Sequence, residues 1–234
     1  MNKRTNVIVS LLALCAWLAP AMPAWAESSP DATDAAPDAA KVQAATQAET
    51  AEEAVQMATE EVLALIQAGQ AYAEEDPERF YVEVEALLAP LIDFPRFARN
   101  VMGAYGRGAS DEQRDRFAES FKWSLVRTYS LALTEFHEGE VNVLPPRKPP
   151  RDPSKVNVMQ EIKYQGKVYQ VVYLMRRGDA GWRVRNMIIE GVNIGLNYKS
   201  QFAAAMKDPE NDGDLDRVID AWSDFVASAE TAES

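Results

Sequence analysis

The chain has 234 residues, of which 47% are hydrophobic and 26% charged, and its 36 acids against 24 bases give a formal net charge of −12. So acidic a chain is a poor ligand for the phosphate backbone of a nucleic acid, and we expect no nucleic-acid partner. The same charge disfavours prolonged adsorption to an anionic membrane. The length is sufficient for one domain with a substantial core.

Residues 1–26 have the pattern of a cleavable signal peptide. Lys3 and Arg4 precede an apolar run at 7–18, which is short for a membrane span of about 20 residues. An Ala-Trp-Ala cleavage site follows at 24–26, and an uncleaved anchor is the alternative. Cleavage would remove Cys15, the single cysteine, and with it any disulfide or thiolate chemistry. We therefore expect an exported protein.

The segment 27–50 is acidic and poor in large apolar side chains, and we expect a disordered linker there. Solvation explains its acids better than a binding role does. A single domain is expected at 51–228, with a flexible tail at 229–234.

The first half of the domain has apolar residues at helical spacing. Four helices are predicted, at 55–66, 80–91, 93–103 and 110–136. Asp93 is a good N-cap for the third of these helices, and Ser110 with Gln113 forms a capping box at the start of the fourth. The fourth helix carries a long apolar stripe.

The second half of the domain changes to strand-like segments. Four strands are predicted, at 139–144, 154–164, 167–176 and 181–190. Tight turns at 165–166 and 178–181 join the last three strands, so the strands form an antiparallel meander. Two more helices are predicted, one capped by Asn193 and one at 214–226. Helices followed by such a meander indicate an α+β domain with the helices packed on one face of the sheet.

Two blocks of this sequence resemble those of a known family. One is the strand, glycine break and helix of residues 181–202. The other runs through residues 93–103 and 113–117 to Tyr129. Together they resemble the MlaC (toluene-tolerance) family of periplasmic phospholipid-binding proteins over roughly residues 55–225.

The resemblance implies an NTF2-like cone, in which helices and a curved, mainly antiparallel sheet enclose an apolar lipid cavity. It implies a periplasmic carrier that shuttles glycerophospholipids between outer and inner membranes as the soluble component of a lipid-asymmetry ABC transport system. The implied partners are an outer-membrane lipoprotein–porin complex and the lipid-binding ring of the inner-membrane ABC transporter. We expect a monomer with phospholipid as cargo and no cofactor.

The strand at 167–176 is apolar on both faces, which fits a sheet with one face against a lipid cavity, although helices covering both faces of a solid core are the alternative. Nine residues are predicted to line the cavity: Tyr105, Leu125, Tyr129, Leu133, Val171, Tyr173, Met187, Ile189 and Val192. The resemblance also marks Arg114 and Lys167 as partner-docking residues, with simple solvated charges as the alternative.

Candidate catalytic residues are few, and no nucleophile, metal or nucleotide motif is present. The single histidine, His137, lies near the predicted end of a helix, where the dipole favours a cation. Glu190 could be a partly buried general base, could pair with Arg183 or Arg185, or could accept backbone hydrogen bonds at the bend. We therefore expect no catalytic residue and no metal site.

Two alternatives to a carrier stay open. The first is an NTF2-like isomerase or hydratase acting on an apolar small molecule, for which Glu190 and Tyr129 are the candidate polar pair. The second is a protein-interaction module with a filled core, which would bind no lipid.

Overall fold

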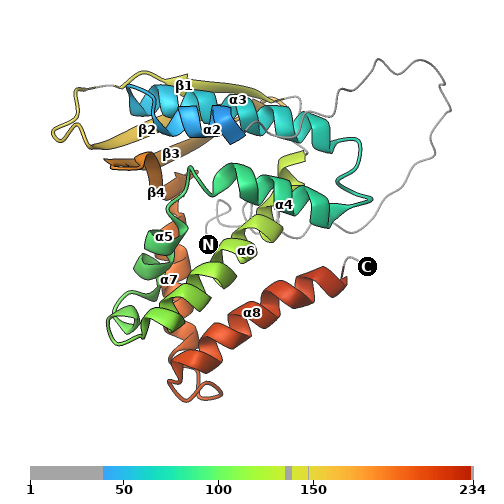
Figure 1. The fold of residues 1–234 in the computed structure, drawn as a ribbon, viewed down its shortest axis with the longest axis vertical. Coiled ribbons are helices and arrows are strands. Elements are labelled where there is room, and N and C mark those ends of the chain that lie inside the picture. The colour runs from blue at the N-terminus through green and yellow to red at the C-terminus, as the bar shows by residue number, and fades with distance from the viewer. Residues whose placement is uncertain (1–38, 135–138, 147, 233–234) are drawn as a thin grey trace. The chain divides into compact units, whose positions relative to one another are not determined.

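The computed structural model describes residues 39–134, 139–146 and 148–232 (Figure 1). The N-terminal residues, which include the predicted signal peptide, lie outside this part of the chain, as does His137. The described residues form seven α-helices: α2 (Ala39–Thr46), α3 (Ala51–Gly69), α4 (Pro77–Leu88), α5 (Phe94–Met102), α6 (Asp111–Thr134), α7 (Ile194–Ala205) and α8 (Leu215–Ala232). They also form five strands: β1 (Glu140–Leu144), β2 (Lys155–Tyr164), β3 (Lys167–Gly178), β4 (Gly181–Ile189) and β5 (Val192–Asn193).

The helices begin at polar caps that the sequence indicates. The Asp93 side chain accepts a hydrogen bond from the backbone N–H of Arg96, which caps α5, and Asn193 caps α7 in the same way. Ser110 and Gln113 exchange hydrogen bonds of 3.1 and 2.9 Å between side chain and backbone, which is the capping box predicted for α6. These local contacts explain why the starts of α5, α6 and α7 were predictable.

The sheet is an antiparallel meander with the order β1-β2-β3-β4-β5, which confirms the α+β class. Gln165 and Gly166 both have positive φ in the β2–β3 turn, as a two-residue hairpin turn requires. The β3–β4 register shifts between Leu174 and Met175, whose partners are Asn186 and Val184, so Arg185 is an extra residue in β4. Such a bulge bends and twists the sheet locally.

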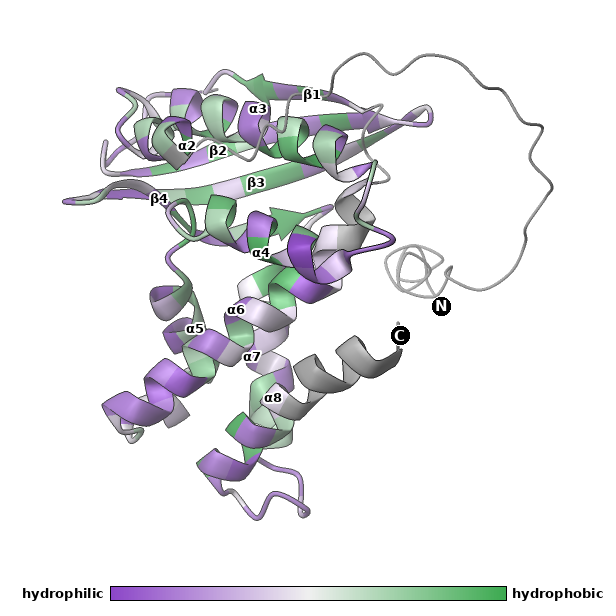
Figure 2. Cartoon of the chain, turned by 45° about the vertical axis from the view of Figure 1, so that its right-hand side comes forward, coloured by the Kyte–Doolittle hydropathy of each residue, from purple (hydrophilic) through white to green (hydrophobic). Residues whose placement is uncertain are grey.

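One face of the sheet packs against helices, and we call it the inner face. Its central row runs in register across all five strands: Val143, Gln160, Val171, Ile189 and Val192. Helix α3 covers β1 and β2 on this face, because Gln160 is hydrogen-bonded to Thr59 of α3 (Figure 1). Figure 2 shows hydrophobic residues along much of β3, whose two faces thus both carry apolar side chains.

The remaining helices pack mainly on one another. Helix α5 contacts both α6 and α7, while α8 lies along α6. Phe117 and Phe121 of α6, Phe202 of α7 and Trp222 of α8 form an aromatic cluster, with ring centroids 4.7 Å apart for Phe117 and Phe202. The expectation that the helices pack on one face of the sheet is therefore only partly right, because α6 and α8 also pack on one another through this aromatic cluster.

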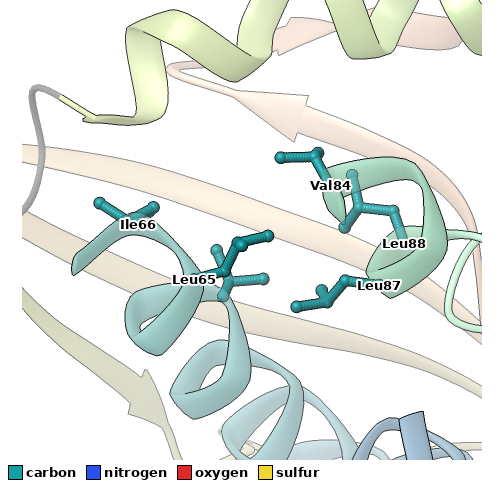
Figure 3. A pocket seen from close by; sticks show the side chains of 6 residues that line it. Leu65, Ile66, Val84, Leu87 and Leu88 are labelled. Atoms are coloured by element: carbon teal, nitrogen blue, oxygen red, sulfur yellow. The ribbon is translucent and has the colours of Figure 1, made fainter. Parts of the chain in front are cut away.

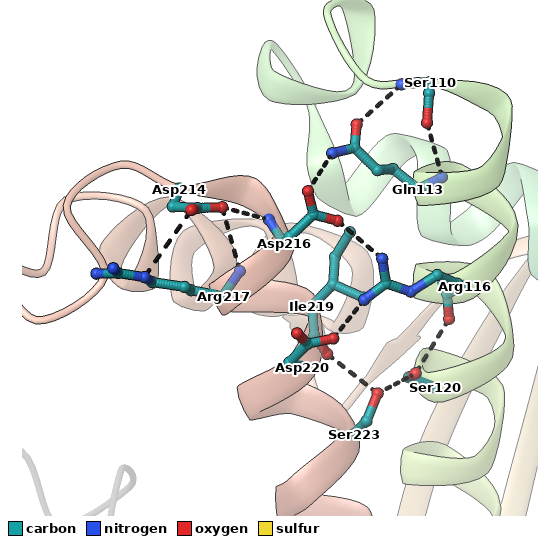
Figure 4. Close-up of polar contacts among 10 residues, drawn as sticks. All are labelled: Ser110, Gln113, Arg116, Ser120, Asp214, Asp216, Arg217, Ile219, Asp220 and Ser223. Atoms are coloured by element: carbon teal, nitrogen blue, oxygen red, sulfur yellow. Dashed lines mark hydrogen bonds and ion pairs between the residues drawn. The ribbon is translucent and has the colours of Figure 1, made fainter.

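A polar network also joins α6 to α8 (Figure 4). The side-chain amide of Gln113 donates to Asp216 at 2.9 Å, and Arg116 pairs with Asp216 at 2.8 Å and with Asp220. One turn further along, the Ser120 and Ser223 hydroxyls lie 2.6 Å apart. The network fixes the register of α8 along α6.

The linker predicted at 27–50 is wrong over its last part, because residues 39–46 form α2 and Val42 and Ala45 are buried. Alanine is the best helix former and needs no large side chain to pack closely, so the absence of large apolar residues was misleading. Close packing is evident at Gly181, where a Cβ atom would lie 2.1 Å from the Thr46 carbonyl oxygen. At the other end, α8 runs to Ala232, beyond the predicted domain end at 228, because the sequence there stays favourable for a helix.

Candidate functional site

A hydrocarbon-lined gap separates α3 from α4. Three side chains of each helix line it, at the i, i+3, i+4 spacing that puts them on one helix face: Val62, Leu65 and Ile66 of α3, and Val84, Leu87 and Leu88 of α4. Figure 3 shows Leu65 and Leu87 pointing toward one another across it. The volume in which the centre of a water molecule could lie is about 10 Å³, so the gap has room for roughly one water. The gap is therefore apolar and narrow.

A chain of hydrogen bonds crosses the core beside the inner face. The Tyr173 hydroxyl donates to Gln160 Oε1 at 2.8 Å, Gln160 Nε2 donates to Thr59 Oγ1 at 2.7 Å, and Thr59 donates to the Val55 carbonyl at 2.7 Å. Gln160 is 2% exposed, so these bonds satisfy polar groups that would otherwise be buried without a partner. These hydrogen bonds connect β3, β2 and α3 to one another.

Two partly buried tyrosines have raised pKa values. Burial raises the pKa of Tyr173 to about 12. Burial also raises the pKa of Tyr198, helped by the neighbouring Tyr129, whose hydroxyl oxygen lies 3.3 Å from that of Tyr198. A tyrosine with a raised pKa is a poor base at neutral pH, so these groups support structure and not proton abstraction.

Five of the nine predicted wall residues lie on the inner face of the sheet. Val171, Ile189 and Val192 share its central row, and Tyr173 pairs with Met187 next to them. A sixth, Leu125 of α6, is buried in the main core. The structure thus brings the sheet residues together, and their contact with lipid stays a prediction.

The other three predicted wall residues lie elsewhere. Tyr105 is part of a short 3₁₀ turn at Tyr105–Arg107, and its ring lies 6.2 Å from that of Phe202. Tyr129 is 40% exposed, and the side chain of Leu133 lies outside the described part of the structure. None of the nine lines the α3–α4 gap. The sequence placed the six gap-lining residues in predicted helices but did not show that they line a gap, because such a stripe has the same spacing as a core stripe.

Glu190 accepts a backbone hydrogen bond at the bend, which was the third alternative considered for it. It has a φ of +49° and is exposed, and its carboxylate accepts a hydrogen bond from the backbone N–H of Gln170. It therefore stabilises the bend and does not face the gap as a general base. Within the described residues, no group of three or more His, Cys, Asp or Glu side chains is placed to hold a metal ion.

The two predicted docking residues occupy different settings. Arg114 lies 2.5 Å from Asp111 and donates to the Gly106 carbonyl at 3.1 Å, so part of its binding capacity is used locally. Lys167 is exposed at the first position of β3.

The structure is an α+β domain with a narrow apolar gap between two of its helices. A family model described as "MlaC protein" matches residues 56–224, and the chain belongs to this MlaC family. The match confirms the resemblance found in the sequence. The family is one of non-catalytic transport proteins, so the isomerase or hydratase alternative is dropped.

Relatives and a solved structure agree with this assignment. The chain is 35% identical over 179 residues to a protein of Pseudomonas putida named "Toluene tolerance protein ttg2D", with 76% of the chain and 82% of the relative covered. It is 26% identical over 144 residues to the Haemophilus influenzae "Intermembrane phospholipid transport system binding protein MlaC", covering 60% of the chain and 67% of the relative. A solved phospholipid-binding protein from Ralstonia solanacearum, in complex with a phospholipid, has a TM-score of 0.70 and 25% identity. That match covers 77% of this chain and 99% of the other.

No helix in the described residues is both long and apolar enough to cross a membrane.

Proposed function

We propose that this protein is a periplasmic carrier that shuttles glycerophospholipids between the outer and inner membranes. The observation that carries the proposal is a gap lined only by hydrocarbon in a fold that matches a solved phospholipid complex. The Haemophilus relative is named for intermembrane phospholipid transport, which supports the same reading. The proposal places the protein as the soluble component of a lipid-asymmetry ABC transport system.

The energetics favour a protein that holds the acyl chains and leaves the head group to solvent. Two acyl chains contain about 30 methylenes, worth about 0.8 kcal/mol each on leaving water, so free desorption from a bilayer is opposed by roughly 24 kcal/mol. A hydrocarbon-lined site provides similar burial, which makes transfer from membrane to carrier close to neutral. We expect weak head-group selectivity and no turnover.

The acyl chains would lie between α3, α4 and the inner face of the sheet. Small-molecule sites have volumes of roughly 300–1,000 Å³, far above the about 10 Å³ of the narrow gap. A rigid empty cavity of that size would destabilise the fold by about 7–24 kcal/mol, at roughly 24 cal/mol per Å³, against a typical stability of about 5–15 kcal/mol. We infer that α3 and α4 separate as the chains enter and close again after release.

The sheet side of the opened cavity would consist of Val171, Tyr173, Met187, Ile189 and Val192. Their alignment on the inner face supports this assignment. The places proposed for Tyr105, Leu125, Tyr129 and Leu133 depend on how far the helices move.

A passive carrier has no energy source, so the direction of transport must come from partners. We propose alternate docking to an outer-membrane lipoprotein–porin complex and to the lipid-binding ring of the inner-membrane ABC transporter. Arg114 and Lys167 are the proposed docking residues, and the exposure of Lys167 supports a role in contact. Reversing Lys167 to Glu should leave the bound lipid unchanged and slow its delivery to a reconstituted transporter ring. Unchanged delivery would remove Lys167 from the interface.

The deciding experiment is lipid mass spectrometry on protein purified from a Gram-negative periplasm. We expect about one diacyl phospholipid for each protein molecule, and an intact mass that corresponds to cleavage after Ala26. A stably folded protein without lipid would contradict the carrier and favour the interaction module with a filled core.

A further inference from the structure

One part of this acidic protein contains bases and no acids. Strands β3 and β4 and helices α5 and α7 contain eight bases and no acid, although the chain carries a net charge of −12. The eight are Arg96, Arg99, Lys167, Arg176, Arg177, Arg183, Arg185 and Lys199. The four elements are neighbours, because β4 contacts β3, α5 and α7, and α5 contacts α7. The bases therefore share one region of the fold.

Six of these bases form a continuous strip. Arg176 of β3 pairs in register with Arg183 of β4, and Arg185 follows at the bulge. Burial lowers the pKa of Arg185, and the carboxylate of Asp93 opposes this shift. The positive charges of Arg96, Arg176 and Arg183 lower the pKa of Arg185 further, because these three arginines are near it. We call Arg96, Arg99, Arg176, Arg183, Arg185 and Lys199 the basic strip.

The strip continues along α5. Arg99 lies one turn beyond Arg96 on the same side of the helix. At the end of α5, a Cβ atom on Gly103 would lie 2.8 Å from the Lys199 side chain, so Lys199 covers this end of the helix. The strip therefore runs from β3 across β4 and along α5 to α7.

Two arginines of the strip, Arg183 and Arg185, bind other parts of the fold. Arg183 donates hydrogen bonds of 2.6 to 3.2 Å to the carbonyls of Ala89, Pro90 and Ile92, and Arg185 pairs with Asp93 at 2.6 Å. The remaining four, Arg96, Arg99, Arg176 and Lys199, are exposed and form no ion pair within the described residues. Like charges held together destabilise a fold, so a purely structural origin does not account for them.

An exposed apolar side chain accompanies the strip. Leu196 is 60% exposed and lies three positions before Lys199 in α7, so the two share a helix face. A surface that combines cations with a protruding apolar side chain is typical of peripheral contact with anionic lipid.

We propose that the basic strip is a docking surface for an anionic bilayer, with phosphate groups paired to its arginines and Leu196 inserted among the lipid head groups. Because the chain as a whole is acidic, attraction at the strip would also orient the molecule on the membrane. Contact would be brief and salt-dependent, which suits a carrier that must leave the surface again. The proposal rests on the carrier function, since it concerns how that carrier meets a membrane.

The test is vesicle flotation with the full purified chain at 50 mM and 300 mM NaCl. The vesicles are phosphatidylcholine alone, or 70% phosphatidylcholine with 30% phosphatidylglycerol. The strip variant is Arg96→Gln with Arg99→Gln and Lys199→Gln. Its matched control is Lys41→Gln with Lys148→Gln and Lys163→Gln, which removes the same charge from exposed residues outside the strip. Melting temperature and bound lipid are measured for every variant.

We expect the wild type to float with phosphatidylglycerol vesicles at 50 mM NaCl, and to lose most of this binding at 300 mM. Each cation beside an anionic membrane strengthens association about fivefold, so the strip variant should bind at least tenfold more weakly while the control stays within twofold. Equal binding by the two variants, or equal binding to both vesicle types, would overturn the proposal. Strip-dependent binding to an acidic protein without vesicle binding would overturn it too and assign the strip to a protein partner. The bound-lipid measurement separates these outcomes from a failure of the carrier function itself.

Discussion

Asp93 links two parts of the fold through one carboxylate. Its Oδ1 accepts the backbone N–H of Arg96 at 3.0 Å, and its Oδ2 lies 2.6 Å from Nη1 of Arg185. The first contact begins α5 and the second fastens that helix to β4. Residues 91–93 also run beside β4, with backbone hydrogen bonds from Asp93 to Val184 and from Val184 to Leu91. The acid thus holds the point where the helical core meets the sheet.

Replacing Asp93 by Asn should separate these two roles. Asparagine caps a helix as well as aspartate does, but it cannot neutralise Arg185 among three other arginines. We expect the free energy of unfolding to fall by about 2 kcal/mol in urea titrations, because a partly buried charge loses its partner. The matched control is Asp76→Asn, which caps α4 through Arg79, and should change stability by less than about 0.5 kcal/mol. Equal losses would mean that the pair with Arg185 contributes little.

Two glycines test whether α2 belongs to the domain. Gly181 and Gly191 have φ values of +89° and +79°, so alanine is strained at both by a similar amount. Alanine at 181 would in addition collide with the Thr46 carbonyl, whereas position 191 has no atom within 4 Å. We expect Gly181→Ala to lower the free energy of unfolding by about 1–3 kcal/mol more than Gly191→Ala, as measured in urea. Similar losses would show that α2 moves away easily.

Alkaline pH should weaken the fold through Tyr173. Its pKa is raised to about 12 in the folded protein, while an unfolded chain releases the proton near pH 10. Between these values the folded state binds more protons, so stability is complete below pH 10 and falls by about 1.4 kcal/mol per pH unit above it. The measurement is the free energy of unfolding at pH 9 and pH 11. Tyr173→Phe should remove the part of the stability loss that comes from ionisation of Tyr173. If the variant loses as much stability between pH 9 and pH 11 as the wild type, Tyr173 is not the cause.

Filling the gap between α3 and α4 should exclude lipid. In Leu88→Trp the larger side chain would occupy the space that must widen for acyl chains. We expect at least a fivefold loss of bound phospholipid by mass spectrometry, with the fold verified by circular dichroism. Val82→Trp is the matched control, because Val82 is 56% exposed on the same helix, and it should keep its lipid. If Leu88→Trp retained lipid, the acyl chains would have to lie elsewhere.

The sequence predicted those parts of the fold that depend on local contacts. The caps at Asp93, Ser110 and Asn193 and the turn at Gln165 involve residues within three positions of one another, so composition and spacing suffice. Helix α2 was missed because part of its packing is distant in the sequence, as at Gly181, more than a hundred residues away. No local pattern contains that contact.

The candidate site divided in a similar way. Four residues predicted for the wall, Val171, Tyr173, Met187 and Ile189, lie together on the inner face, because a strand places every second side chain on the same side, and their contact with lipid stays a prediction. The residues of α3 and α4 could not be distinguished from core residues, since spacing shows that a stripe is apolar but not whether it meets another side chain or a gap. Tyr129 was expected in the wall because of its motif, yet α6 presents it 40% exposed beside Tyr198.

The narrow, all-hydrocarbon gap between α3 and α4 bears on how a docking partner could sense cargo. If acyl chains hold these two helices apart and their release lets Leu65 and Leu87 meet, the distance between the helices reports whether lipid is bound. A receptor surface that bridged α3 and α4 could then distinguish full from empty molecules without touching lipid. The lipid-bound and lipid-free forms of the protein would then bind different receptors. The distance between α3 and α4 would determine which receptor each form binds.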